Sequence, residues 1–239
     1  MECWADCLGD CAGGQSREHY ISDGIFDGES VTAFGLSWCK DRPISIGLGS
    51  ATSRILCKKH NESLSDVDAE AAKLSRFISS NIAVQPLSRD SMVLSGQALE
   101  KWSLKTLLSL GYIGALDPTS FTRLKPSVEI VNPLFRGVPV PEGAGLYFVT
   151  SSLSSDDFKV GLAWKAIRNQ SNGKVFGMAF TFNGLRFVVS MLPNRGEKQI
   201  NAMGVVDGFD YSAATVIYRP ANVILGSVTT GRKVIDLQW

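Results

Sequence analysis

The chain has 239 residues, of which 44% are hydrophobic and 20% charged, and its formal net charge is +1. This length allows one large or two small packed domains, and the small net charge counts mildly against a non-specific binder of nucleic acid or anionic membranes. The sequence contains no apolar run of about 18 residues and no basic-then-apolar leader, so we expect a cytoplasmic protein without a membrane partner.

The first 61 residues carry all five cysteines and both histidines. Clustered cysteines in a cytoplasmic chain favour metal ligation over a disulfide framework. Cys57 and His60 have the spacing of two zinc ligands on one knuckle, and two upstream cysteines would complete a tetrahedral site. We favour Cys3 and Cys11 as those partners, and Cys7 stays open as the alternative ligand.

The fourth upstream cysteine and the basic residues of this segment are not assigned to the metal site. Cys39 follows Trp38 and is interpreted as a half-buried apolar residue. A basic strip with one intervening acid can be a solvated face or a phosphate contact, and both interpretations stay open. Its members are Lys40, Arg42, Arg54, Lys58 and Lys59.

Two helices are predicted after this segment. Apolar residues recur at helical spacing over residues 66–79, and Ser65 with Asp68 forms a plausible capping box. A second helix follows Gly96 and ends at Gly111 or Gly114, with Glu100, Lys101 and Lys105 alternating with its apolar residues. The proline-rich residues 117–145 are expected to be extended connections with short edge strands.

The C-terminal half is predicted to be mostly antiparallel sheet. Asn183 and Gly184 separate two apolar runs and favour a type I′ hairpin turn. The alternating Phe176, Phe180, Phe182 and Phe187 are interpreted as a sheet core. The β-branched or aromatic runs that predict strands are residues 146–150, 158–167, 175–182, 185–192, 215–219 and 223–229.

Three pieces of the first 61 residues together resemble the HNH (His-Asn-His) endonucleases: the cysteine cluster, residues 16–22 and residues 55–61. The pattern Gly-Asp-Cys-x-Gly-Gly-x-Ser-Arg-Glu-His-Tyr-Ile-Ser, followed by Leu-Cys-x-x-His-Asn-x-x-Leu-Ser-x-x-Asp, is similar to uncharacterised bacterial HNH-like proteins. The resemblance covers residues 3 to about 68. It implies a ββα-metal core held together by a structural zinc ion.

The resemblance also implies catalytic roles. His19 matches the general base that activates water, and Glu18 matches an acidic ligand of a catalytic Mg²⁺ or Mn²⁺ ion. Asn61 matches the last motif position, which completes that ion's protein shell. Two features depart from the family pattern: Thr52 stands at the position of the middle Asn, and the leading cysteines are spaced by four.

The sequence therefore predicts an α+β chain in three regions. Residues 1–80 form the HNH-like zinc-bound ββα-metal module, residues 81–145 a helical and proline-rich connection, and residues 146–239 an antiparallel β domain. The expected function is metal-dependent hydrolysis of nucleic-acid phosphodiesters, with DNA as the expected partner, and Arg17, Arg54, Lys58 and Lys59 as its contacts. The alternative is a non-catalytic zinc module that binds nucleic acid or a protein, with the β domain available for self-association or a protein partner.

Overall fold

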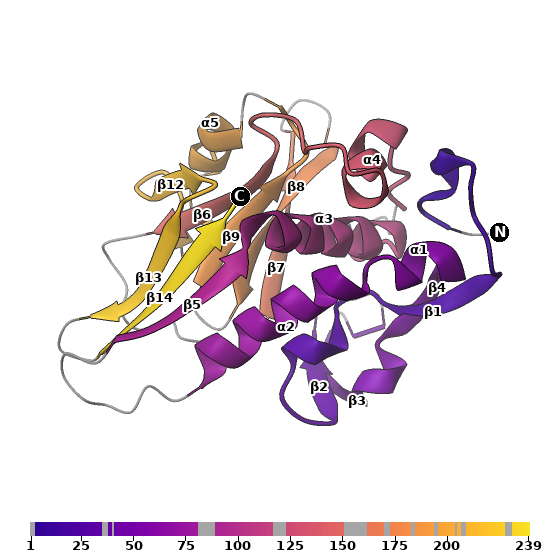
Figure 1. Ribbon diagram of the computed structural model, residues 1–239, viewed down its shortest axis with the longest axis horizontal. Coiled ribbons are helices and arrows are strands. Elements are labelled where there is room, and N and C mark those ends of the chain that lie inside the picture. Colours follow the sequence, from indigo (N-terminus) through magenta and orange to yellow (C-terminus); the bar gives the residue numbers. More distant parts are fainter. Residues whose placement is uncertain are drawn as a thin grey trace. The chain divides into compact units, whose positions relative to one another are not determined.

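In the computed structural model the chain is a mixed α+β protein (Figure 1). The structure describes residues 3–34, 38–39, 41–80, 89–116, 123–150, 162–169, 173–182, 185–193, 196–203, 205–206, 209–227 and 231–239. The chain divides into two compact units, each built from two segments: unit 1 is Met1–Ala72 with Lys101–Val140, and unit 2 is Lys73–Glu100 with Pro141–Trp239. The predicted regions are continuous in sequence, whereas each unit of the structure combines two separate segments of the chain.

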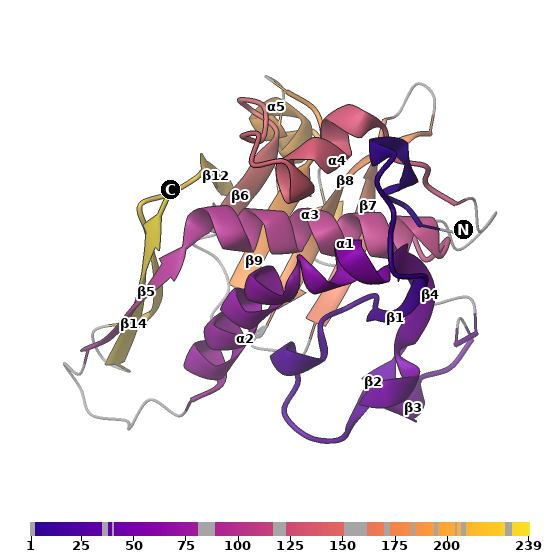
Figure 2. The same cartoon turned by 45° about the vertical axis from the view of Figure 1, so that its right-hand side comes forward.

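Unit 1 contains an antiparallel strand pair followed directly by a short helix. β1 (Gln15–His19) pairs with β4 (Thr52–Cys57), and α1 (Lys58–Glu62) begins where β4 ends. Figures 1 and 2 both show α1 beside these two strands, and α1 contacts each of them. The other elements wholly in unit 1 are η1 (Asp6–Leu8), η2 (Asp23–Ile25), the pair β2 (Ser30–Ala33) and β3 (Ile44–Gly47), η3 (Leu48–Ser50) and α4 (Val128–Phe135).

A β-bulge interrupts the pairing of β1 with β4. Ser16 lies opposite Leu56 and Glu18 opposite Ser53, so two residues of β4 face the single residue Arg17. A bulge changes the direction of the side chains around it. Of the two β4 residues, Ile55 is buried and Arg54 is exposed. Arg17 of β1 and Arg54 of β4 therefore both lie in the bulge, and both are exposed.

Unit 2 contains two larger sheets. The five-stranded sheet is antiparallel and has the order β12-β6-β9-β8-β7, and the three-stranded sheet has the order β13-β14-β5. In the smaller sheet the middle strand, β14, is antiparallel to β13 and parallel to β5. The strands are β5 (Arg89–Ser95), β6 (Gly145–Thr150), β7 (Leu162–Arg168), β8 (Val175–Phe182), β9 (Leu185–Ser190), β12 (Thr215–Tyr218), β13 (Asn222–Ser227) and β14 (Gly231–Gln238).

Smaller elements complete the fold. β10 (Val205–Val206) pairs with β11 (Phe209–Asp210), and α5 (Gly196–Asn201) contacts β12. Ile200 of α5 joins a core cluster formed on the five-stranded sheet, which includes Tyr147 and Val188. α2 (Ser65–Ser79) and α3 (Gly96–Tyr112) each contribute residues to both units.

Several sequence predictions are confirmed. α2 covers the predicted residues 66–79 with one more residue at its start, and the predicted strand 175–182 matches β8. Phe182 pairs with Leu185, so β8 and β9 form the expected hairpin, although its two turn residues lie outside the described residues. The four phenylalanines expected in the sheet core are all buried: Phe176, Phe180, Phe182 and Phe187.

Two local predictions are wrong, and two charged side chains are unexpectedly buried. The proline-rich stretch forms α4, which contains Pro133 and buries Val131 and Leu134. The capping box does not form, since the Ser65 hydroxyl donates to the Glu62 carbonyl instead. Of the charged residues that alternate with the apolar residues of α3, Glu100 and Lys105 are buried.

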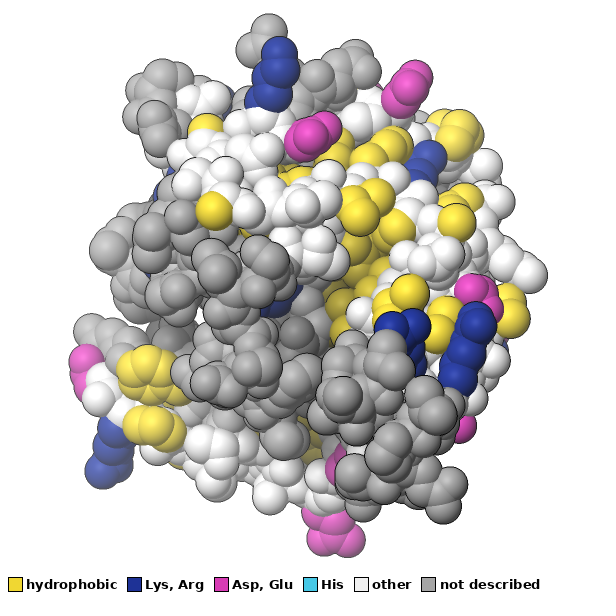
Figure 3. Space-filling model, turned by 90° about the vertical axis from the view of Figure 1, so that its left-hand side faces the viewer, with side chains coloured by type: hydrophobic (Ala, Val, Ile, Leu, Met, Phe, Trp, Pro, Cys, Tyr) yellow, Lys and Arg dark blue, Asp and Glu magenta, His cyan; other side chains and the backbone are white. Residues whose placement is uncertain are grey.

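Some apolar side chains remain on the surface. Val93 on β5 is 58% exposed and Ile224 on β13 is 55% exposed, on the two strands that flank β14. The face of the molecule in Figure 3 carries hydrophobic side chains between scattered charged ones. None of the helices among the described residues combines the length and apolarity that a membrane crossing requires.

Candidate metal centre

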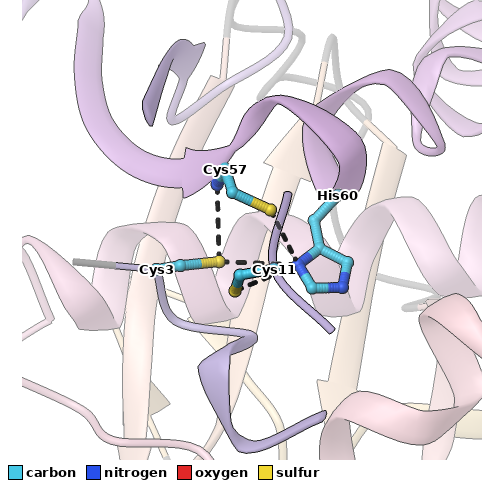
Figure 4. A group of neighbouring side chains, drawn as sticks. All are labelled: Cys3, Cys11, Cys57 and His60. Atoms are coloured by element: carbon cyan, nitrogen blue, oxygen red, sulfur yellow. Dashed lines mark hydrogen bonds between the residues drawn. The ribbon is translucent and has the colours of Figure 1, made fainter. Parts of the chain in front are cut away.

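Four side chains of unit 1 converge as a candidate metal centre: Cys3, Cys11, Cys57 and His60 (Figure 4). Their potential ligand atoms all lie within 4.8 Å of one another. Cys3, Cys57 and His60 are buried, and Cys11 is half-buried. This is the group that the cysteine clustering and the Cys57-x-x-His60 spacing predict, with Cys3 and Cys11 as the upstream pair.

Local structure brings three of these residues together. Cys57 is the last residue of β4 and precedes α1, so His60 lies one helical turn further on the same side. The backbone N–H of Trp4 donates to the Ile55 carbonyl at 3.0 Å, which attaches the N-terminal segment to β4. The N–H of Cys57 lies 3.4 Å from Cys3 Sγ and donates to it.

A two-glycine turn positions Cys11. Gly13 and Gly14 have φ values of 79° and 76°, in the left-handed region that glycine adopts without strain. The N–H groups of Lys58 and Lys59 donate to the carbonyls of Gly14 and Ala12, so this turn satisfies two free donors at the start of α1. The turn thereby holds Cys11 against the helix that carries His60.

The distances suit a tetrahedral zinc site. His60 Nδ1 lies 3.2 Å from Cys57 Sγ, 3.6 Å from Cys3 Sγ and 3.8 Å from Cys11 Sγ. Ligand atoms at normal zinc bond lengths in a tetrahedron are about 3.5–3.8 Å apart. Soft thiolates with one imidazole are the donor set that zinc prefers for structural sites. The group can therefore hold a metal such as zinc.

The pKa values of the four groups shift in different directions. Burial raises the pKa of the Cys3 thiol and raises the pKa of Cys11 to about 12. Burial also acts to raise the pKa of Cys57, but hydrogen bonds from the backbone of His60 and Ala12 bring it below its usual value. Burial lowers the pKa of His60, which keeps its imidazole in the neutral, ligand form at pH 7.

The far side of the His60 ring is occupied by residues that sequence reasoning missed. Asp10 Oδ1 accepts from Nε2 of His60 at 3.1 Å, and Asp10 Oδ2 contacts Lys59 Nζ at 2.5 Å and Arg136 Nη2 at 2.9 Å. The ring of Phe135 lies 4.7 Å from that of His60. Asp10 directly precedes the candidate ligand Cys11, and this position in the sequence could have indicated its role. Phe135 and Arg136 are about 75 residues away from His60, and no sequence signal connects them with it.

The other two cysteines lie apart from this group. Cys7 is exposed within η1. Partial desolvation of its thiol raises the pKa above the usual value for cysteine. Cys39 is buried, as a small apolar residue would be. The preference for Cys11 over Cys7 therefore agrees with the geometry.

Glu18 belongs to a different cluster of polar side chains. It is 4% exposed, and its Oε1 lies 2.5 Å from Nζ of the buried Lys105. Lys105 Nζ also donates to both carboxylate oxygens of Asp68, at 2.7 Å each. Ser22 Oγ donates to Asp68 and accepts from Trp102 Nε1. We call these five residues the Glu18 cluster. Asp68 therefore contacts Lys105 and Ser22 and does not have the helix-capping role that the sequence predicts.

The remaining motif residues have contacts of their own. Asn61 Nδ2 donates to Ser16 Oγ at 2.9 Å. His19, the last residue of β1, is half-buried, and its buried Nε2 has no hydrogen-bond partner among the described residues. Thr52 lies opposite His19 in the strand register and donates to the Gly49 carbonyl.

The predicted phosphate contacts divide into two groups. Arg17, Arg54 and Lys58 are exposed, and only Lys58 has a carboxylate nearby, Glu62 at 3.7 Å, among the residues the structure describes. Lys59 pairs with Asp10. Arg42 is exposed, and Lys40 lies outside the described residues.

Comparison with known proteins found no match among protein-family models, curated proteins or solved structures.

Proposed function

We propose that unit 1 is a zinc-stabilised module that binds nucleic acid through phosphate contacts. The four converging donors support a structural role for the metal, because four protein ligands leave no open position for water or substrate. The two partners that a catalytic divalent ion would need are already engaged: Glu18 contacts Lys105, and Asn61 donates to Ser16. This arrangement favours the binding module over the nuclease.

The observation that carries the proposal is the pair of arginines at the β1–β4 bulge. Side chains at neighbouring positions on paired strands interact, and like charges there are destabilising. Arg17 and Arg54 both lie in this bulge and are exposed. A phosphate group would offset this repulsion, and two arginines on an exposed strand pair suit a phosphate backbone.

Binding of labelled single-stranded DNA, duplex DNA and RNA over a range of salt concentrations tests this function. Replacing both Arg17→Ala and Arg54→Ala should lower the slope of log affinity against log salt by about two, one for each lost phosphate contact. The matched control replaces Arg89 and Arg232, which are also exposed and are facing residues on β5 and β14. The proposal is wrong if wild-type protein binds none of these ligands, or if both double variants lose affinity equally.

We propose phosphodiester hydrolysis of the HNH type as the second candidate. One observation supports it: the buried Nε2 of His19 has no partner among the described residues, in a unit where β1 pairs with β4 and α1 follows β4 directly. In this candidate His19 accepts the proton of the attacking water. Glu18 would have to exchange Lys105 for Mg²⁺ or Mn²⁺, with Asn61 as a further ligand.

Nicking of plasmid and single-stranded substrates by zinc-loaded protein with Mg²⁺ or Mn²⁺ tests the second candidate. His19→Ala should reduce the rate by about a hundredfold to ten-thousandfold while zinc content is unchanged. Asn61→Ala and Glu18→Ala should instead change the dependence on the added divalent ion. If the zinc-loaded wild type does not cut, or if His19→Ala cuts equally fast, the hydrolytic candidate is wrong and only the binding function remains.

A further inference from the structure

We propose that Asp10 is the positioning residue of the metal centre and holds His60 in the form that coordinates through Nδ1. The two oxygens of its carboxylate have separate partners. Oδ1 accepts from His60 Nε2 at 3.1 Å, while Oδ2 contacts Lys59 Nζ and Arg136 Nη2. One oxygen is therefore available for the imidazole, while two cations hold the other.

The tautomer of His60 explains why this contact matters. A neutral imidazole has one N–H and one free lone pair, and the acceptor bound to one nitrogen decides which nitrogen keeps the proton. Asp10 next to Nε2 favours the proton on Nε2, so the lone pair of Nδ1 is directed to the three cysteine sulfurs. Without Asp10, the His60 ring would also adopt a tautomer and orientations in which Nδ1 cannot bind the metal, and these forms would compete with the metal-binding form.

Asp10 is itself held in place by the end of α4. Arg136, the residue after α4, contacts Asp10 at 2.9 Å and reaches toward the Leu8 carbonyl at 3.5 Å. The preceding residue, Phe135, packs against the rings of both His60 and Trp4. Two consecutive residues thus restrain both the imidazole and the carboxylate that orients it.

The charges around the site also balance. A zinc ion bound to three thiolates and a neutral imidazole carries a net charge of −1. The surrounding Asp10, Lys59 and Arg136 together carry +1. These three residues therefore offset the net charge of the loaded centre as well as fixing the ring.

Zinc affinity measured by chelator competition on the full chain tests the proposal. Asp10→Ala should weaken zinc binding about 10- to 100-fold, the usual effect of removing a partner of a ligating histidine. Asp10→Asn should lose less, because its amide oxygen can still accept from Nε2. Asp6→Asn, an exposed aspartate of the same segment, is the matched control and should bind zinc like wild type.

A direct readout of the His60 ring separates positioning from general stability. In ¹⁵N spectra of zinc-loaded wild type, His60 should show a coordinated Nδ1 and a protonated Nε2 with slow proton exchange, and Asp10→Asn should exchange this proton faster. Arg136→Gln should weaken zinc binding in the wild-type background and add little to Asp10→Asn, since both act through one carboxylate. Asp10→Ala and Arg136→Gln that both hold zinc as tightly as wild type would overturn the proposal, and wild type without bound zinc would overturn the metal centre itself.

Discussion

Unit 1 contains two buried clusters of metal-binding side-chain types, and they differ in the source of their positive charge. The candidate metal centre consists of three thiols and an imidazole, which need an external cation to become a charged ligand set. In the Glu18 cluster, two carboxylates already share the ammonium group of Lys105. Ligand-type residues therefore indicate a metal site only when no side chain from elsewhere in the chain supplies the charge.

Loss of the metal should have the largest effect. Cys57→Ser removes a ligand, so zinc should be lost and residues 3–62 should lose protection from hydrogen exchange, while unit 2 stays protected. Structural zinc binding amounts to about 10–16 kcal/mol in small zinc-dependent peptides, which is enough to decide whether such a segment folds. Cys7→Ser is the control, because Cys7 is exposed and outside the group. Equal zinc content in the two variants would contradict the assignment.

Removal of the internal cation should have the next largest effect. Lys105→Ala leaves the buried Glu18 and the half-buried Asp68 without their partner and should lower the free energy of unfolding by about 3–5 kcal/mol. Lys101→Ala, on the same helix, is the control and should change it by less than about 0.5 kcal/mol. Restored stability of Lys105→Ala in Mg²⁺, without restoration of the double variant with Glu18→Gln, would contradict this contrast. This result would show that the Glu18 cluster also binds metal, and the two clusters would then not differ in the source of their positive charge.

The glycine turn beside the metal centre gives a smaller and more local effect. Alanine at Gly13 would have to adopt a left-handed conformation, and its Cβ would lie 2.9 Å from Lys58 Cβ. Gly9→Ala introduces a similar φ, 74°, but its Cβ meets no atom within 4 Å. Both should cost about 1–2 kcal/mol of strain. Only Gly13→Ala should also weaken zinc binding, as measured by chelator competition; equal affinities would mean that Cys11 is positioned without the turn.

The smallest effect is a difference in pH dependence between the clusters. Zinc ligands must lose protons, so the stability from the metal centre rises with pH. Burial raises the pKa of Glu18 in the folded state, against the opposing effect of Lys105. A raised folded-state pKa gives stability that is complete below the ordinary glutamate pKa, about 4.3, and declines as pH rises through the folded value.

Glu18→Gln removes this titration. The free energy of unfolding of wild type minus that of Glu18→Gln, both with excess zinc, should therefore fall as the pH rises from about 4. Zinc binding is common to both proteins, so the difference isolates Glu18. A difference that rises with pH would mean that Lys105 outweighs the effect of burial.

The features that the sequence predicts well are local ones. Cys57 and His60 are one helical turn apart, so their spacing alone places two ligands together. The helical spacing of the apolar residues in α2 likewise decides which face of that helix is buried. These elements are visible in sequence because their burial pattern repeats over a few residues.

The features that it misses depend on partners distant in sequence. Lys105 looks like a solvent-facing residue of α3, and its burial is explained only by Glu18 and Asp68. The prolines of residues 117–145 suggest extended chain, yet α4 forms with Phe135 against Trp4 and His60. β14 was not predicted, and its parallel pairing with β5 joins residues about 140 positions apart. Local periodicity contains no information about such partners.

The position of β14 in the middle of its sheet has a consequence for synthesis on the ribosome. β5 is made early, but its partner in the sheet, Gly231–Gln238, follows only after roughly 140 more residues. At the usual 5–20 residues per second, β5 therefore waits on the order of ten seconds before it can form its hydrogen bonds. Throughout this interval the nascent chain exposes an unpaired strand, and long-range parallel pairing is slow to form afterwards. The newly made chain is thus expected to depend on chaperones more than its size alone suggests.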